Sequence, residues 1–184
     1  ETFKELVQRL NWTGPVGCGF PAIVRHGVAH SASNIDKGWL GQNIETLFSE
    51  ASGLSVAALN DADAAGYAEM DFGKGKGQGG SVLLITIGSG IGTALFVDGQ
   101  EVPNTEFGHL IMHNMIAEHY VSNSARKKLD LSWEKWGKRF NEYLLHLERL
   151  LSPDLFILGG GISKDFDSYH KYLKVETPVT PAKL

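Results

Sequence analysis

Residues 81–109 read S-V-L-L-I-T-I-G-S-G-I-G-T-A-L-F-V-D-G-Q-E-V-P-N-T-E-F-G-H, and this stretch decides the fold. The apolar run Val82–Ile87 predicts a buried strand, and Thr93–Val97 predicts a second strand. Between them lies the turn Gly88–Gly92, with the sequence G-S-G-I-G. A turn of this kind leaves backbone N–H groups free to point at an anion. The alternative is an ordinary glycine-rich hairpin that binds no ligand.

A polar cluster, Glu106–His109, follows a tight Asp98-Gly99 turn and a third short strand. Glutamate offers a hydrogen-bond acceptor and histidine a donor or an acceptor, which suits a ligand rich in hydroxyl groups. The plainer alternative is a surface charge beside a capped histidine. His109 and His113 stand four residues apart, but with no convincing third ligand and only one cysteine this spacing does not favour a metal site.

Composition narrows the function class. The chain has 184 residues, 42% of them hydrophobic and 21% charged, as expected for a globular protein. The formal net charge of −4 and the lack of an arginine-rich tract argue against nucleic-acid binding. No apolar run approaches the roughly 18 residues of a membrane span. A single cysteine, Cys18, excludes an internal disulfide. We therefore expect a cytoplasmic protein without a membrane partner.

Strands that alternate with helices predict an α/β sheet, with ligands at the carboxyl ends of the strands. The glycine-rich tract Gly73–Gly80 (G-K-G-K-G-Q-G-G) is predicted to be a hinge loop. It would separate residues 1–72 from residues 81–184. Residues 22–40 are expected to be loop. Helices are expected over residues 2–10, 43–52, 62–72, 117–129 and 132–151, followed by a last one after Gly161, and further strands over 16–20, 54–59 and 154–158.

Asn60-Asp61 lies where an apolar strand meets an alanine-rich helix. A carboxylate at this place suits a general base that takes a proton from a hydroxyl. The alternative is a helix N-cap, in which Asn60 or Asp61 accepts hydrogen bonds from the first N–H groups. The triplet Gly159–Gly161 follows the strand L-F-I-L, so it is either a close backbone approach to a ligand or a tight turn.

Several long strings occur together and in order: L-N-D-A-D-A-A-G-Y-A-E, T-I-G-S-G-I-G-T-A-L-F-V-D-G, V-P-N-T-E-F-G-H-L and S-P-D-L-F-I-L-G-G-G-I-S-K. They resemble the sugar kinases of the ROK family, and most closely its bacterial polyphosphate-using glucokinases. The likeness runs from about Gly14 to Leu184. It implies the two-lobed actin/hexokinase-like (ribonuclease H-like) fold, with residues 1–72 in an incomplete first lobe and residues 81–184 in the second.

The resemblance also implies roles for single residues. Asp61 matches the catalytic base that deprotonates the 6-hydroxyl of the sugar. The positions that match glucose-binding residues are Asn34, Asn60, Glu106, His109 and Glu118, with the Phe20-Pro21 turn facing the sugar. The positions that match donor-phosphate binding are Gly88, Ser89, Gly90, Gly92, Gly159, Gly160 and Gly161.

Three departures from the family pattern qualify the resemblance. Many members bind zinc through the histidine equivalent to His109 and a cysteine cluster; the segment after His109 has no cysteine, so we expect no zinc. The turn has G-S-G where G-T-G is more common, which keeps the hydroxyl. The first phosphate loop of the family, D-x-G-G-[ST], does not occur in the 184 residues. We therefore expect this chain alone to have little kinase activity.

The activity implied is phosphoryl transfer from inorganic polyphosphate or ATP to the 6-hydroxyl of glucose. Mg²⁺ would accompany the donor, and the family commonly forms homodimers. Two alternatives stay open: a sugar-responsive transcriptional regulator, because the same family includes repressors, and a degenerate sugar-binding module.

Overall fold

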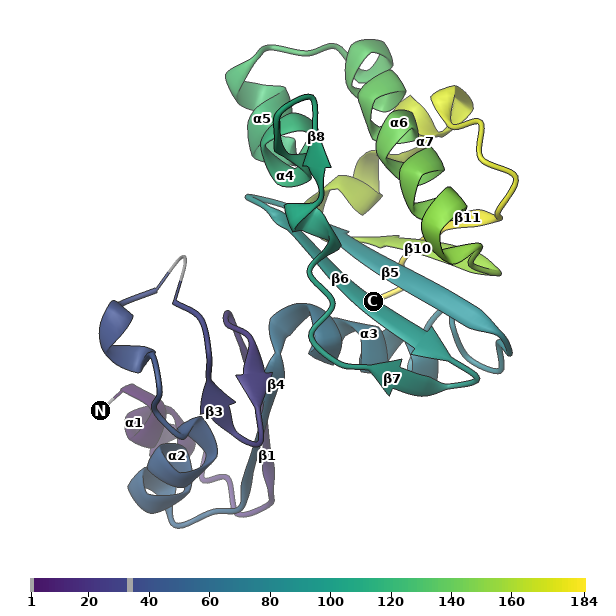
Figure 1. Ribbon diagram of the computed structural model, residues 1–184. Coiled ribbons are helices and arrows are strands. Elements are labelled where there is room, and N and C mark those ends of the chain that lie inside the picture. Colours follow the sequence, from purple (N-terminus) through teal and green to yellow (C-terminus); the bar gives the residue numbers. More distant parts are fainter. Residues whose placement is uncertain (1, 33–34) are drawn as a thin grey trace. The chain divides into compact units, whose positions relative to one another are not determined.

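The computed structural model describes residues 2–32 and 35–184, and Figure 1 shows its elements. The chain divides into two compact units, Glu1–Ala64 and Ala65–Leu184. Helix α3 (Asp61–Phe72) begins in the first unit and continues in the second. The division therefore falls inside a helix and not at the glycine tract Gly73–Gly80, where we expected it.

The first unit holds small sheets and short helices. Its elements are α1 (Thr2–Arg9), β1 (Val16–Phe20), β2 (Val24–Arg25), β3 (Val28–Ala29), the 3-10 helix η1 (Lys37–Trp39), α2 (Ile44–Ser52) and β4 (Val56–Asn60). Strands β1 and β4 pair in parallel, and β2 and β3 form an antiparallel hairpin. Asn43 caps α2 by accepting a hydrogen bond from the Thr46 N–H, and Gly53 ends the helix in the left-handed conformation.

The second unit is larger and contains every remaining element. They are β5 (Ser81–Ile87), β6 (Ile91–Val97), β7 (Gln100–Val102), η2 (Phe107–His109), β8 (Ile111–Met112), β9 (Met115–Ile116), α4 (Ala117–Val121), α5 (Asn123–Lys128), α6 (Trp133–Leu151), β10 (Leu155–Gly159), η3 (Gly161–Asp165), α7 (Phe166–Tyr169), η4 (His170–Tyr172) and β11 (Val179–Pro181).

A five-stranded sheet in the order β11-β10-β5-β6-β7 forms the centre of the second unit. Strands β11, β10 and β5 are parallel, whereas β5, β6 and β7 are antiparallel neighbours. Side chains alternate across the sheet, so Leu83 and Ile85 join one apolar cluster while Val82 and Leu84 join another. Helices α4 to α7 cover the first face and α3 covers the second (Figure 1). Both faces of β5 are thus buried.

Most predicted elements form within one or two residues of their expected bounds, including the Asp98-Gly99 hairpin turn, where both residues have positive φ. Residues 22–40 are not only loop, because they contain β2, β3 and η1. The expected helix 117–129 is two helices. Ser122 is extended and caps α5 through the Ala125 N–H, so the helix breaks there.

The glycine tract expected to be a hinge is tied to the second unit by the buried residue Glu69. The Glu69 carbonyl accepts the Gly73 and Gly75 N–H groups, and its carboxylate accepts the Lys74 N–H at 2.8 Å. The residues up to Leu184 also form structure in the second unit. β11 pairs with β10, and the Leu184 N–H donates to Glu69 at 2.7 Å.

Candidate functional site

The junction of β4 and α3 in the first unit carries Asn60 and Asp61. The Asn60 Oδ1 accepts the Ala62 N–H at 2.8 Å and the Asp63 N–H at 3.4 Å, which makes Asn60 the helix cap. Its Nδ2 donates to the Ala22 carbonyl at 3.0 Å, which ties the cap to the turn after β1. Asn60 is therefore held in one orientation by bonds at both ends of its amide.

Because Asn60 caps the helix, the carboxylate of Asp61 is not needed for that purpose. Asp61 is exposed, and among the described residues its Oδ1 accepts the Ala62 N–H at 2.9 Å. The first turn of α3 places positive backbone partial charge beside this carboxylate. The two neighbouring residues therefore do different things: Asn60 caps helix α3, and Asp61 presents a carboxylate to solvent.

Two further predicted sugar-facing positions belong to the first unit. Asn34 lies outside the described residues, so its predicted contact stays a prediction. At the Phe20-Pro21 turn, Phe20 is buried in the core while Pro21 is exposed, and the Ala22 N–H donates to the Phe20 carbonyl at 2.8 Å.

In the second unit, Gly88, Ser89 and Gly90 close the hairpin between β5 and β6. The Gly88 N–H donates to the Gly90 carbonyl at 3.0 Å, so this amide is already engaged. The N–H groups of Ser89 and Gly90 have no acceptor in the part of the chain that the structure describes. The amides available to an anion are therefore two, which is fewer than the sequence led us to expect for the whole Gly88–Gly92 turn.

Glu118, at the start of α4, lies against this turn. Its Oε2 accepts the Ile91 N–H at 3.4 Å, and a Cβ on Gly90 would lie 2.5 Å from the same oxygen. Because Gly90 has no side chain, there is room for the Glu118 carboxylate beside the turn. The glycine turn and the glutamate that the sequence assigned to two different roles are in direct contact.

The segment that carries Glu106 and His109 is fixed to β6 by Thr93. The buried Thr93 hydroxyl donates to the Thr105 carbonyl at 2.7 Å and accepts the Phe107 N–H at 3.2 Å. Gly108 lies so close to Ile91 that any side chain there would meet the Ile91 carbonyl. The Glu106 Oε2 and the His109 Nδ1 are 3.2 Å apart, so the two predicted sugar ligands form a pair. Sequence reasoning missed Thr93, because a threonine within a strand carries no signal of such a role.

The third glycine motif also reaches this end of the sheet. Gly160 has φ +76°, and a Cβ there would lie 2.6 Å from the Ile87 carbonyl oxygen and 2.7 Å from its nitrogen. Only glycine allows this backbone approach. Gly161 begins η3 with open space at its Cβ position, whereas Gly159 ends β10 beside Thr86. Gly159–Gly161 and Gly88–Gly92 are therefore neighbours, since Ile87 precedes Gly88 directly.

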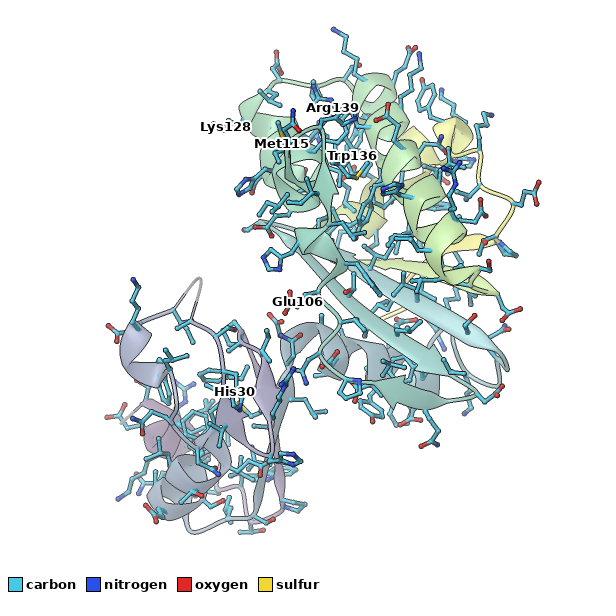
Figure 2. The ribbon with its side chains drawn as sticks, in the orientation of Figure 1. His30, Glu106, Met115, Lys128, Trp136 and Arg139 are labelled. Atoms are coloured by element: carbon cyan, nitrogen blue, oxygen red, sulfur yellow. The ribbon has the colours of Figure 1, made fainter. Side chains whose placement is uncertain are left out.

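Residues 87–91 thus form the meeting point of the predicted site residues in the second unit. Gly160 packs on Ile87, Glu118 contacts Gly90 and Ile91, and Gly108 packs on Ile91. Figure 2 labels Glu106 beside the strands of this unit. The ends of β5 and β6 therefore bring Glu118, Gly108, Gly160 and the open amides of the turn close together.

A metal site is not formed by these residues. No group of three or more His, Cys, Asp or Glu side chains that could hold a metal occurs among residues 2–32 and 35–184. His113, the second histidine of the spacing considered above, contacts Glu142 at 3.0 Å instead. In the same described ranges no helix is long and apolar enough to cross a membrane.

Comparison with known proteins adds the decisive observation. The ROK family pattern matches residues 1–123. Over its whole length the chain is 44% identical to the polyphosphate glucokinase of Mycobacterium tuberculosis, of which it covers 70%. The chain belongs to the ROK family.

Solved ROK structures agree with this membership. The inorganic polyphosphate/ATP-glucomannokinase of Arthrobacter sp. strain KM is 46% identical, with a TM-score of 0.91 over 99% of this chain and 73% of that one. A ROK family glucokinase from Streptomyces griseus, solved with glucose and AMPPNP, has a TM-score of 0.77 at 22% identity and covers 94% of this chain and 77% of its own. That second likeness concerns the fold alone. The fold is mixed α/β of the actin/hexokinase-like type, as predicted.

Proposed function

We propose that this ROK chain acts in glucose phosphorylation, transferring a phosphoryl group from inorganic polyphosphate or ATP to the 6-hydroxyl of glucose. The observation that carries the proposal is the contact of Glu118 with the Gly88–Gly92 turn, together with the Glu106–His109 pair on a segment whose Gly108 packs on Ile91. Hydroxyl-binding groups beside open backbone amides suit a sugar next to a phosphate. The names of the Mycobacterium tuberculosis and Arthrobacter relatives, which are both above 40% identity and both polyphosphate-using sugar kinases, support the same activity.

Asp61 takes the proton of the 6-hydroxyl as that oxygen attacks the donor phosphorus. The Asp61 carboxylate is exposed, and the side chain that caps the helix is that of Asn60. Phosphoryl transfer depends on positioning and on charge stabilisation, and one correctly placed carboxylate orients the attacking oxygen. Asn60 holds the start of α3 in place, and its remaining amide hydrogen is free to donate to the sugar.

The sugar-binding residues divide the hydrogen-bonding work. The carboxylates of Glu106 and Glu118 accept hydrogen bonds from sugar hydroxyls, and His109 donates to or accepts from another. Because Glu106 pairs with His109 through Nδ1, the imidazole Nε2 is the nitrogen that faces the ligand. Asn34 is predicted to add a contact from the first unit.

The donor phosphate binds at the two neighbouring glycine motifs. The Ser89 and Gly90 amides donate to phosphate oxygens and stabilise the charge that develops on them. Gly161 leaves open space for the donor next to these amides. The Glu118 carboxylate lies beside the same turn, so it disfavours an anion deep in the turn and directs the phosphate to its outer side.

Mg²⁺ is predicted to accompany the donor, but the described residues form no cluster that would hold it. A magnesium ion bound chiefly by donor phosphates and water agrees with such a site. Homodimer formation and a cytoplasmic location remain predictions.

The test is a product assay with both donors. The enzyme is incubated with glucose and either long-chain polyphosphate or ATP, and glucose 6-phosphate is measured by coupling to its dehydrogenase. Because the first phosphate loop of the family does not occur in the 184 residues, we expect little product from this chain alone. A version extended by that loop should give product with polyphosphate, and phosphorus NMR should place the new ester on the 6-oxygen. Glucose binding without product from either donor in that version would instead support the degenerate sugar-binding module. Glucose-dependent binding to DNA would support the regulator.

A further inference from the structure

The hairpin β8–β9 stands between two of the proposed sugar ligands. Its strands pair Ile111 with Ile116 and Met112 with Met115, and the Ala117 N–H donates to the Leu110 carbonyl at 2.8 Å. His109 directly precedes this closed segment and Glu118 directly follows it. The base of the hairpin therefore sets the spacing between His109 and Glu118.

The tip of the hairpin is anchored on helix α6. His113 and Asn114 form the turn with φ of 50° and 60°, as in a two-residue hairpin turn. The His113 Nε2 lies 3.0 Å from the Glu142 Oε2. The side chain of His113 thus joins a surface hairpin, which has only two residue pairs, to the long helix α6.

The same Glu142 oxygen also holds α4. The Tyr120 hydroxyl donates to the Glu142 Oε2 at 3.1 Å, and Tyr120 stands two residues after Glu118. The rings of His113 and Tyr120 are 4.7 Å apart, and the Arg139 guanidinium lies 4.6 Å from the centre of the Tyr120 ring. In Figure 2, Met115 of the hairpin and Arg139 of α6 are labelled at the same end of the second unit.

The Glu142 Oε2 therefore accepts one hydrogen bond from the tip of the hairpin, which lies between His109 and Glu118, and a second from α4, which carries Glu118. Hydrogen bonds to a charged acceptor are the stronger kind. Burial and the hydrogen bond to Glu142 raise the pKa of Tyr120, so its hydroxyl stays protonated and can donate to the Glu142 carboxylate. Trp136, one and a half turns before Glu142, is fully buried and fixes this part of α6 in the core.

We propose that Glu142 is a positioning residue of the sugar site: it holds the tip of β8–β9 and helix α4 on α6 and so fixes the spacing between His109 and Glu118. The inference rests on the proposed function, since it takes His109 and Glu118 as glucose ligands. Glu142 does not touch the sugar. Glu142 acts on glucose affinity, because a mobile hairpin base would let the distance between His109 and Glu118 vary.

The test compares Glu142→Ala with a matched control, Glu134→Ala. Both glutamates lie on α6 and have similar side-chain exposure, 49% and 53%, but Glu134 pairs only with Lys138 on the same helix. We expect Glu142→Ala to raise the Kd and the KM for glucose by about five-fold, with kcat and the donor KM changed by less than about two-fold. Glu134→Ala should stay within about two-fold of wild type in every parameter.

Two further variants keep the proposal testable if Glu142→Ala does not fold. Tyr120→Phe removes one hydrogen bond and keeps the ring contacts, so it should raise the glucose KM by a smaller factor. Glu142→Gln keeps an acceptor and should restore part of the affinity. Wild-type glucose affinity in folded Glu142→Ala or in Tyr120→Phe would overturn the proposal, as would a fall in kcat without a change in KM.

Failure of the proposed function would be seen separately, as wild-type enzyme that neither binds nor phosphorylates glucose. In that case amide hydrogen exchange at Ala117 tests the anchor itself. Faster exchange at Ala117 in Glu142→Ala than in Glu134→Ala supports the anchor, and equal exchange in the two variants overturns it.

Discussion

The two units bury their apolar side chains in different ways. In the first unit a small cluster around Phe20, Ala29 and Ile44 is completed by half-buried aromatic rings, and α1 has no buried residue. In the second unit the sheet lies between two apolar clusters, and large side chains such as Trp136 and Phe96 are fully buried. Backbone positions in the second unit are therefore fixed more firmly by packing.

This difference matters for the site. The residues proposed to hold the sugar and the phosphate lie in the second unit, at the ends of strands whose faces are both packed. The proposed base, Asp61, follows the last strand of the first unit, on the helix that continues into the second. Under the proposed function, the well-packed unit would position the ligands and the first unit would carry the proton acceptor.

The largest expected effect on stability comes from Trp136→Ala. The indole of Trp136 is fully buried among Phe140, Tyr169 and Trp133, and its Nε1 donates to the Val121 carbonyl at 2.9 Å. Its loss should lower the free energy of unfolding of the second unit by about 3–5 kcal/mol. Hydrogen exchange of the β5 amides would measure this unit alone, because a chain of two units need not unfold in one step.

The matched change in the first unit is Trp39→Ala. Trp39 is only half-buried, with edge contacts to Phe20 and Phe48. We expect a smaller loss, about 1–3 kcal/mol, measured from exchange of the β4 amides. Equal losses at Trp39 and Trp136 would show that the two cores do not differ in the way described here.

A smaller effect than that of Trp136→Ala is expected from Gly160→Ala, with Gly161→Ala as its neighbour control. A Cβ at Gly160 would meet the Ile87 backbone, and φ is positive there, so alanine should cost about 2–3 kcal/mol in the second unit. Gly161 has open space, so Gly161→Ala should fold normally and instead raise the donor KM. Urea unfolding and donor kinetics together check the pair. Normal stability of Gly160→Ala would contradict the close approach of the two glycine motifs.

The smallest effect concerns Tyr143, whose buried hydroxyl has no hydrogen-bond partner in the described part of the chain. Tyr143→Phe should leave stability at pH 7 unchanged within about 1 kcal/mol. Burial raises the pKa of Tyr143 far above its usual value of 10, so the neutral form is favoured in the folded state. This stability is present below about pH 10 and is lost as the pH rises further, by up to about 1.4 kcal/mol per pH unit.

Tyr143→Phe should therefore flatten the loss of stability of the second unit between pH 10 and 11, as followed by urea unfolding at a series of pH values. All five tyrosines of the chain lie in the second unit, so the first unit should lose less over this range. An unchanged pH profile in Tyr143→Phe would contradict the burial of a neutral hydroxyl.

Most helices and strands were predicted well, because the sequence patterns that mark them lie within the elements themselves. Apolar runs marked β5 and β6. The break at Ser122 was missed because a helix pattern continues on both sides of it. The strands β2 and β3 were missed because each has only two residues, and β11 was missed because its partner β10 is distant in the sequence.

The candidate site could be predicted as residue types but not as an arrangement. The motifs named Glu106, His109 and Glu118, yet nothing in the spacing indicated that Glu118 would accept a hydrogen bond from the Gly88–Gly92 turn. The cap-or-base question at Asn60-Asp61 also needed coordinates, because either side chain could have reached the first N–H groups of α3. The structure shows that Asn60 caps the helix, and the role of Asp61 as the base stays a prediction.

The central claim is that Asp61 serves as the proton acceptor for the glucose hydroxyl, and Asp61→Asn tests it most directly. Asparagine keeps an oxygen for the Ala62 N–H and loses only the basic carboxylate. In a version of the protein that includes the first phosphate loop of the family, the account predicts a fall in kcat by a factor of about 10³ or more, with the Kd for glucose within about three-fold of wild type. Asp71→Asn, an exposed change on the same helix, should leave both values unaltered. A kcat within ten-fold of wild type, or a parallel loss of glucose binding, would contradict the account.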